Sequence, residues 1–164
     1  MVTKKKEYLK RSHFYMFDKA LMGKVREVCK GKKFNLAQKE QIRLGFQQGF
    51  TAEQVRFYAR EDFESEQMLE FREVIEKGFT AKQLSLFAKP GFDWKQMYFM
   101  EQGFEDGFTI KQVALYADPA FNIDQILEIM LSFETQLTTE QVKKFAKPEI
   151  PADEMRRIRH ELLL

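Results

Sequence analysis

The sequence repeats with a period of 29 residues, and this feature constrains the fold more than any other. The triplet Gly-Phe-Thr begins at positions 49, 78 and 107, and Gln136-Leu137-Thr138 continues the series. A fixed period of this length is typical of solenoids, in which each unit buries its apolar face against its neighbours. The sequence therefore predicts an all-α fold, a right-handed-type α-solenoid built from helix-turn-helix repeats.

Each repeat opens with the pattern of a short, capped helix. Threonine stands at the expected N-cap and glutamine follows three positions later, as in Thr51 and Gln54, which is the pattern of a capping box. Phe50 and Val55 have the spacing of a hydrophobic staple around this box. Valine or leucine, an aromatic residue and alanine then share one helix face, and proline ends the helix in three of the four repeats.

A second, longer helix is predicted in the other half of each repeat. Its expected caps are Glu64, Asp93 and Asn122, each with glutamine three positions later, and Pro151 replaces the cap in the last repeat. Apolar residues spaced by three and then four positions follow each cap, which is the spacing of a helix and not of a strand.

These patterns divide the chain into a repeat domain and a different N-terminal segment. The repeat domain covers residues 34–164, with a half repeat at 34–48 and repeats from about 49, 78, 107 and 136. Residues 1–33 are expected to form a basic tail and a helix over 7–30 that Gly31 ends. This helix does not match the repeat, so we expect it to cap the stack, as terminal units of solenoids commonly do.

Composition indicates a globular, cytoplasmic protein. The chain is 44% apolar and 32% charged, which is too apolar for a disordered polymer. The single cysteine, Cys29, cannot form an intrachain disulfide and fits a reducing compartment. We expect neither a membrane span nor a cleaved signal peptide, because no sufficiently long apolar run is present.

The residues that usually carry enzyme chemistry are scattered in this sequence. His13 and His160 lie near opposite ends, and Cys29 lies in the predicted capping helix without an orienting third group. No His/Cys spacing resembles a zinc site, and no glycine-rich phosphate loop is present. We therefore expect a non-catalytic protein with no metal site and no cofactor.

Positions that differ between repeats are the better guide to binding, because the shared positions build the core. On the long helices these positions combine Trp, Tyr and Met with Arg, the composition of interface hot spots. The predicted partner-binding residues are Trp94, Tyr98, Phe99, Met130, Leu131, Arg156 and Arg159. For Tyr98, binding and an extension of the core are both open, because leucine occupies the same position in two other repeats.

Two other functions are compatible with the sequence. Residues 1–33 contain 11 Lys/Arg and 3 Asp/Glu, a net charge of +8, whereas residues 34–142 contain 10 and 18, a net charge of −8. The basic segment is a candidate nucleic-acid contact, with Lys4, Lys5, Lys6, Lys10 and Arg11 as its cations. Alternatively, the variable apolar positions of the long helices could pack against a second copy of the chain in a homo-oligomer, so a monomer and a homodimer are both open.

The recurrent line G-F-T-x-x-Q-V-x-x-[YF]-A-x-P-x-F-[DN]-x-x-Q-[MI] resembles a repeat of uncharacterised proteins from Gram-positive bacteria and their phages, plasmids and conjugative elements. The resemblance covers residues 34–162. The first unit departs from it, with Glu61-Asp62 in place of Pro90-Gly91. The resemblance implies a small protein of a mobile element that binds host or defence machinery, for example as an inhibitor of a CRISPR nuclease. The resemblance assigns no functional role to any residue of this chain.

Overall fold

The computed structural model describes residues 19–89 and 91–164, and all regular elements in these ranges are helices, which confirms the all-α prediction. Residues 19–29 are helical, within the range predicted for the N-terminal helix, and Leu21, Val25 and Val28 are buried. The helices that follow are α2 (Leu36–Gln47), α3 (Ala52–Tyr58), α4 (Ser65–Glu76), α5 (Ala81–Phe87), α6 (Trp94–Glu105), α7 (Ile110–Val113), α8 (Ile123–Glu134), α9 (Thr139–Val142) and α10 (Ala152–Leu162).

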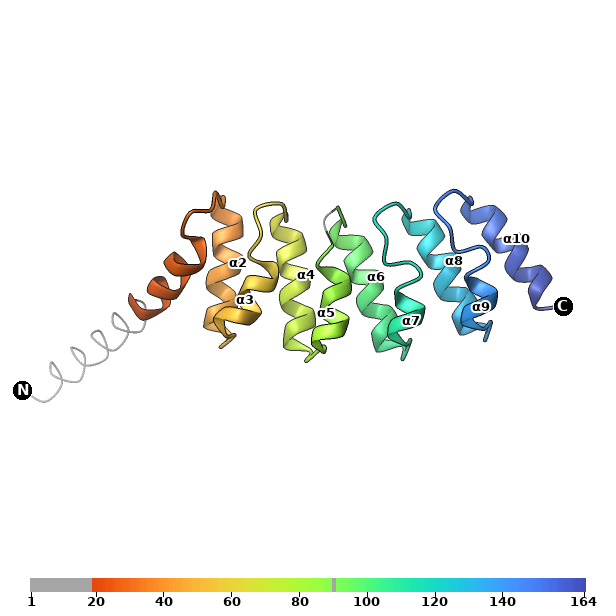
Figure 1. Cartoon of the computed structure of the whole chain (residues 1–164), viewed down its shortest axis with the longest axis horizontal. Helices are drawn as coiled ribbons and strands as arrows, with labels where there is room; N and C mark the ends of the chain where they lie inside the picture. The colour runs from red at the N-terminus through yellow and green to blue at the C-terminus, as the bar shows by residue number, and fades with distance from the viewer. Residues whose placement is uncertain (1–18, 90) are drawn as a thin grey trace, which may run out of the picture. The chain divides into compact units, whose positions relative to one another are not determined.

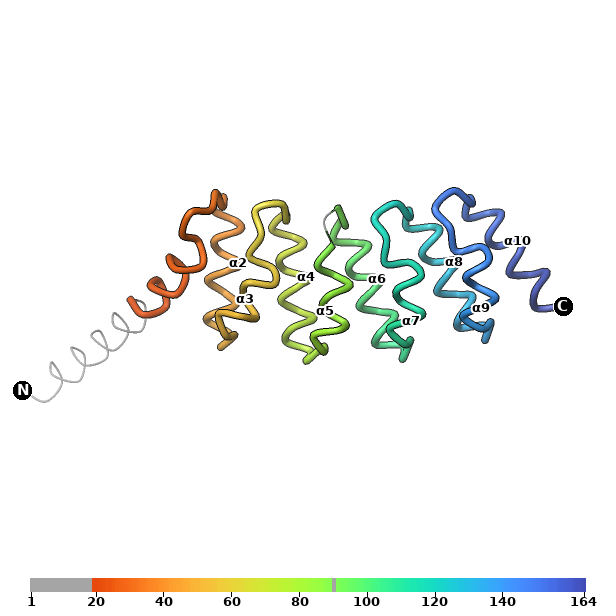
Figure 2. The backbone as a smooth tube through the Cα atoms, viewed as in Figure 1, coloured from red at the N-terminus to blue at the C-terminus, as the bar shows by residue number. Residues whose placement is uncertain are grey.

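The described part of the chain forms two compact units, and the division between them falls within α4, between residues 72 and 73. In the first unit, α2 packs against α3. In the second unit, α6 packs against α7 and α8, and α8 packs in turn against α9 and α10. Figure 1 shows α6, α8 and α10 side by side, and Figure 2 shows how the backbone passes through a short helix between consecutive long ones.

Long and short helices begin at regular intervals along the chain. The long helices begin at Leu36, Ser65, Trp94, Ile123 and Ala152, each 29 residues after the last. The short helices begin at 52, 81, 110 and 139, with the same interval.

The predicted capping boxes set these starting points. Thr51, Thr80, Thr109 and Thr138 each accept a hydrogen bond from the amide three residues on, and the glutamine there accepts one from the amide of the cap. Asn35, Asp93 and Asn122 form the same box on long helices, and Pro151 makes no side-chain cap. A box satisfies two amides that a helix start leaves unpaired.

Two of the short helices are shorter than the sequence pattern predicts. The pattern extends α7 and α9 to the aromatic residue, whereas the α-helices end at Val113 and Val142. After Val113 the backbone tightens: Leu115 N donates to Gln112 O at 3.1 Å and Tyr116 N to Val113 O at 3.1 Å. Such three-residue hydrogen bonds commonly close the last turn of a helix. The aromatic side chains are still buried, so this change leaves the core contact intact.

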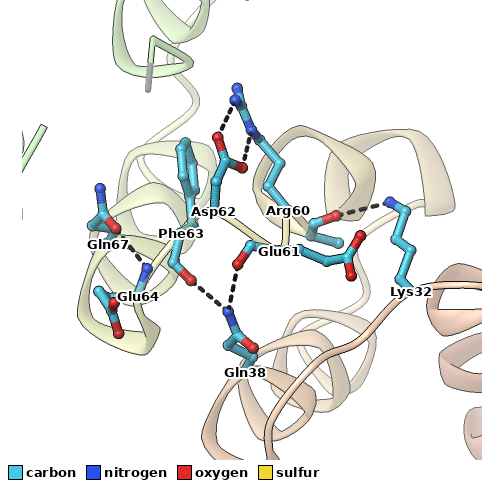
Figure 3. A network of polar contacts seen from close by, with 9 residues as sticks. Lys32, Gln38, Arg60, Glu61, Asp62, Phe63, Glu64 and Gln67 are labelled. Carbon is cyan, nitrogen blue, oxygen red and sulfur yellow. Dashed lines mark hydrogen bonds and ion pairs between the residues drawn. The ribbon is translucent and has the colours of Figure 1, made fainter. Parts of the chain in front are cut away.

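The glutamine of each long-helix box also fastens its helix to a distant loop. Gln38 Nε2 donates to Phe63 O at 2.6 Å, as Figure 3 shows, while Gln38 Oε1 accepts from Asn35 N. In the second unit, Gln96 Nε2 donates to Phe121 O at 2.6 Å and Gln125 Nε2 to Ile150 O at 2.7 Å. Each bond joins residues 25 apart, so one amide group satisfies both a helix start and the loop before the next long helix.

Glycine and tyrosine are matched in size within the core. Cβ built on Gly103 would lie 1.9 Å from Tyr116 Oη, and Cβ on Gly45 would lie 1.8 Å from Tyr58 Oη. Both tyrosines are fully buried, and the Tyr116 hydroxyl donates to Phe99 O at 3.4 Å. Burial raises the pKa of Tyr116 above its ordinary value, because ionisation there would leave a charge without water.

One repeat departs from the pattern at a left-handed backbone position. Gly49, Gly78 and Gly107 have φ of 92°, 79° and 85°, whereas Gln136 takes φ of 66° at the equivalent place. A side chain there is unfavourable because Cβ approaches the neighbouring carbonyl.

We therefore expect Gln136→Gly to raise the free energy of unfolding by about 0.5–1 kcal/mol, the strain relieved minus the extra entropy of glycine in the unfolded chain. Urea titration followed by circular dichroism measures the change. Gln102→Gly, inside α6, is the control and is expected to destabilise by about 1 kcal/mol. A loss of stability in Gln136→Gly would contradict the assignment of strain to this position.

Candidate protein-binding surface

Large apolar side chains are exposed along α6 and α8. Trp94 and Tyr98 on α6 keep 44% and 42% of their surface exposed, and Leu127 and Leu131 on α8 keep 43% and 37%. We call these four residues the apolar stripe. Side chains of this size are usually buried, and adjacent exposed ones are typical of interaction surfaces.

The four side chains lie on the same side of their helices. α6 and α8 occupy equivalent parts of the repeat, and both bury the positions held by Met97 and Met100 in α6. Tyr98 and Leu127 are equivalent positions. Trp94 lies one turn before Tyr98 on α6, and Leu131 lies one turn after Leu127 on α8. Because α6 and α8 are in contact, the stripe continues from one helix to the next.

The other predicted residues of α6 and α8 differ in exposure. Phe99 is half-buried, and its ring centroid lies 5.4 Å from that of Tyr98 in an edge-to-face arrangement. Tyr98 itself is too exposed to be a core residue. Leu127, which was not among the predicted binding residues, belongs to the surface; the signal was its equivalence to Tyr98.

Met130 and Arg159 do not line an accessible surface, contrary to the prediction. Each keeps only 6% of its surface exposed. The two positions are equivalent, and Arg159 faces the preceding long helix, where it pairs with Glu128 of α8. They were predicted to bind a partner because they differ between repeats, but both side chains are buried within the unit.

Arg159 and Arg156 share one carboxylate at the seam between α8 and α10. Arg156 Nε donates to Glu128 Oε1 at 2.7 Å, and an Arg159 terminal nitrogen lies 3.2 Å from Glu128 Oε2. Glu128 and Arg159 are both buried, whereas the Arg156 side chain is 58% exposed. Within the described residues, the buried Arg159 Nε has no hydrogen-bond partner.

A second ionic group lies at the far end of α6. Lys77 contacts the buried carboxylate of Glu101 and, at 2.5 Å, the exposed carboxylate of Glu105. The hydrogen bond to Glu101, followed by that to Glu105, raises the pKa of Lys77 above its ordinary value. All three charges are used in holding the loop after α4 against α6, so this group serves structure.

The remaining predictions fall elsewhere. The candidate nucleic-acid contacts Lys4, Lys5, Lys6, Lys10 and Arg11 lie outside the described residues. Across residues 19–89 and 91–164, no helix is both long enough and apolar enough to cross a membrane.

Comparisons with family models, curated proteins and solved structures yielded no match to this chain.

Proposed function

We propose that the chain is a non-catalytic helical-repeat protein, an α-solenoid of period 29, that binds another protein through the apolar stripe. The observation that carries this proposal is the exposure of Trp94, Tyr98, Leu127 and Leu131 on neighbouring helices of one unit. Burying such side chains against a partner contributes about 1.5–3 kcal/mol for each one fully removed from water. Aromatic residues at the centre of a contact supply a disproportionate share of that energy.

The even spacing of the helices supports the repeat part of the proposal. Each long helix has nearly the same length, and its N-terminal glutamine binds the loop that leads to the next long helix. Proteins of this construction present long surfaces on equivalent faces of successive helices. Inhibition of host or defence machinery, implied by the resemblance, is one outcome that such binding would serve.

The test is capture of a partner by the full chain and by a variant with Trp94→Ser and Leu127→Ser. Both side chains are exposed, so we expect the variant to fold with unchanged circular dichroism and to lose the partner. Leu36→Ser is the matched control, because Leu36 on α2 is 85% exposed and lies outside the stripe. A partner captured by the wild type must then bind again as a purified protein.

Three results would contradict the proposal. A partner retained by the Trp94/Leu127 variant would place binding elsewhere. A partner lost after nuclease treatment would favour the nucleic-acid function of the basic segment. A dimer in sedimentation that the Trp94/Leu127 variant converts to a monomer would show that the stripe buries itself in a homo-oligomer.

A further inference from the structure

We infer that the partner docks an amphipathic α-helix across α6, α8 and α10, with two apolar anchors on Tyr98 and Leu127 and a carboxylate on Arg156. This inference rests on the proposed function and specifies the chemistry of the partner. Tyr98, Leu127 and Arg156 are three equivalent positions on consecutive long helices. All three side chains are exposed, so they form one row across the unit.

The spacing of this row favours a helical partner. Packed helices lie about 8–10 Å apart, so each step along the row is of that size. A helix advances about 10.5 Å in seven residues and returns to the same face after those two turns. An extended strand advances about 7 Å in two residues and about 13 Å in four, and residues between those steps point to the other side. A helix therefore matches the row at positions i, i+7 and i+14.

The charge at the end of the row favours a carboxylate. Glu128 carries one negative charge, and it is shared by the guanidinium groups of Arg156 and Arg159. These three side chains together keep a net charge of +1 beside the apolar stripe. The Nε of Arg159 is buried without a hydrogen-bond partner among the described residues, so the single carboxylate does not satisfy both arginines.

Arg156 can accept an additional carboxylate because of its geometry. Its Nε and one terminal nitrogen face Glu128. A guanidinium group has five N–H donors, so the edge turned away from Glu128 is available in a side chain that is 58% exposed. The apolar residues next to it exclude water from such a pair and strengthen it.

The test is selection from a displayed library of 20-residue helical peptides, randomised at positions i, i+4, i+7, i+11 and i+14. Selection uses the full chain, with counter-selection on the Trp94→Ser and Leu127→Ser variant. We expect enriched peptides to carry apolar residues at i and i+7 and Asp or Glu at i+14. Their affinity should fall about tenfold or more for Arg156→Gln, the range of a close interfacial charge pair.

Arg157→Gln is the matched control, because Arg157 is an exposed neighbour that pairs with Glu154 and Glu161 on α10 itself. It should leave the affinity within about twofold, as expected for an exposed charge outside the contact. Peptides with Lys or Arg at i+14, or with equal losses in both variants, would overturn the assigned charge while leaving the proposed function standing. A library without a peptide that depends on Trp94 and Leu127 would overturn the helical partner, and the capture experiment decides the proposed function separately.

Discussion

Replacement of Gln125 by glutamate is expected to lower the free energy of unfolding by about 2–4 kcal/mol at pH 7, because it removes a donor from two carbonyls and buries a charge. Gln125 Nε2 donates to Pro148 O at 2.9 Å and Ile150 O at 2.7 Å, and the residue is only 3% exposed. A carboxylate has no N–H group, so both carbonyls would face a negative oxygen.

The matched control is Gln112→Glu. In the capping box of α7, Gln112 Oε1 accepts a hydrogen bond from Thr109 N at 2.8 Å. A glutamate oxygen can accept the same bond. Gln112 is also less buried than Gln125. We expect this variant to change stability by less than about 0.5 kcal/mol, since glutamate serves at this position of a capping box as commonly as glutamine.

The loss of stability in Gln125→Glu should also depend on pH. The buried glutamate of Gln125→Glu is expected to have a pKa above its unfolded value of about 4.3, because burial and the two carbonyls disfavour its charge. A glutamate whose pKa is higher in the folded than in the unfolded protein stabilises the fold at pH values below the unfolded pKa. That stabilisation is lost as the pH rises through the folded pKa. The deficit of the variant should therefore shrink toward pH 4. Urea titrations from pH 4 to 8 measure it, and equal deficits in the two variants at every pH would contradict the role of the Gln125 amide.

The second large effect is expected at Gly103. Gly103→Val should destabilise by about 2–4 kcal/mol, because its Cβ would overlap Tyr116 Oη and force the buried ring to move. Thermal and urea unfolding of the full chain measure the change. Gly23→Val is the control for the substitution itself: at this helical position, no atom of residues 19–89 or 91–164 lies within 4 Å of a built Cβ.

Removing the hydroxyl should rescue the variant. Gly103→Val combined with Tyr116→Phe reproduces the pair Val74 and Phe87, which occupies the equivalent positions one repeat earlier and is fully buried. Tyr116→Phe alone should cost about 0.5–1.5 kcal/mol for its hydrogen bond to Phe99 O. We expect the double variant to be more stable than Gly103→Val, with a coupling of at least about 1.5 kcal/mol. Additive losses would contradict the size match.

The sequence alone determined the features that depend on neighbouring residues. A capping box involves positions three apart, so Thr51 with Gln54 and Asn122 with Gln125 were sufficient to locate helix starts. The helical spacing of the apolar residues likewise predicted which side of each long helix is buried, as at Met97 and Met100. The ends of α7 and α9 were less well predicted, because hydrogen bonding in a last turn responds to packing.

Only the tertiary structure decided which variable positions are accessible. Leu131 and Met130 are adjacent in the sequence and similar in character, yet Leu131 is exposed and Met130 is buried. The tertiary structure also showed that Gln125 donates to two carbonyls that lie 23 and 25 residues later in the sequence. It likewise showed why position 103 is glycine, because a side chain there would overlap the hydroxyl of Tyr116, 13 residues away. Local patterns report backbone hydrogen bonding and periodicity, whereas exposure and size matching depend on which helix lies alongside. That neighbour is fixed by the packing of the whole unit and not by any stretch of sequence taken alone.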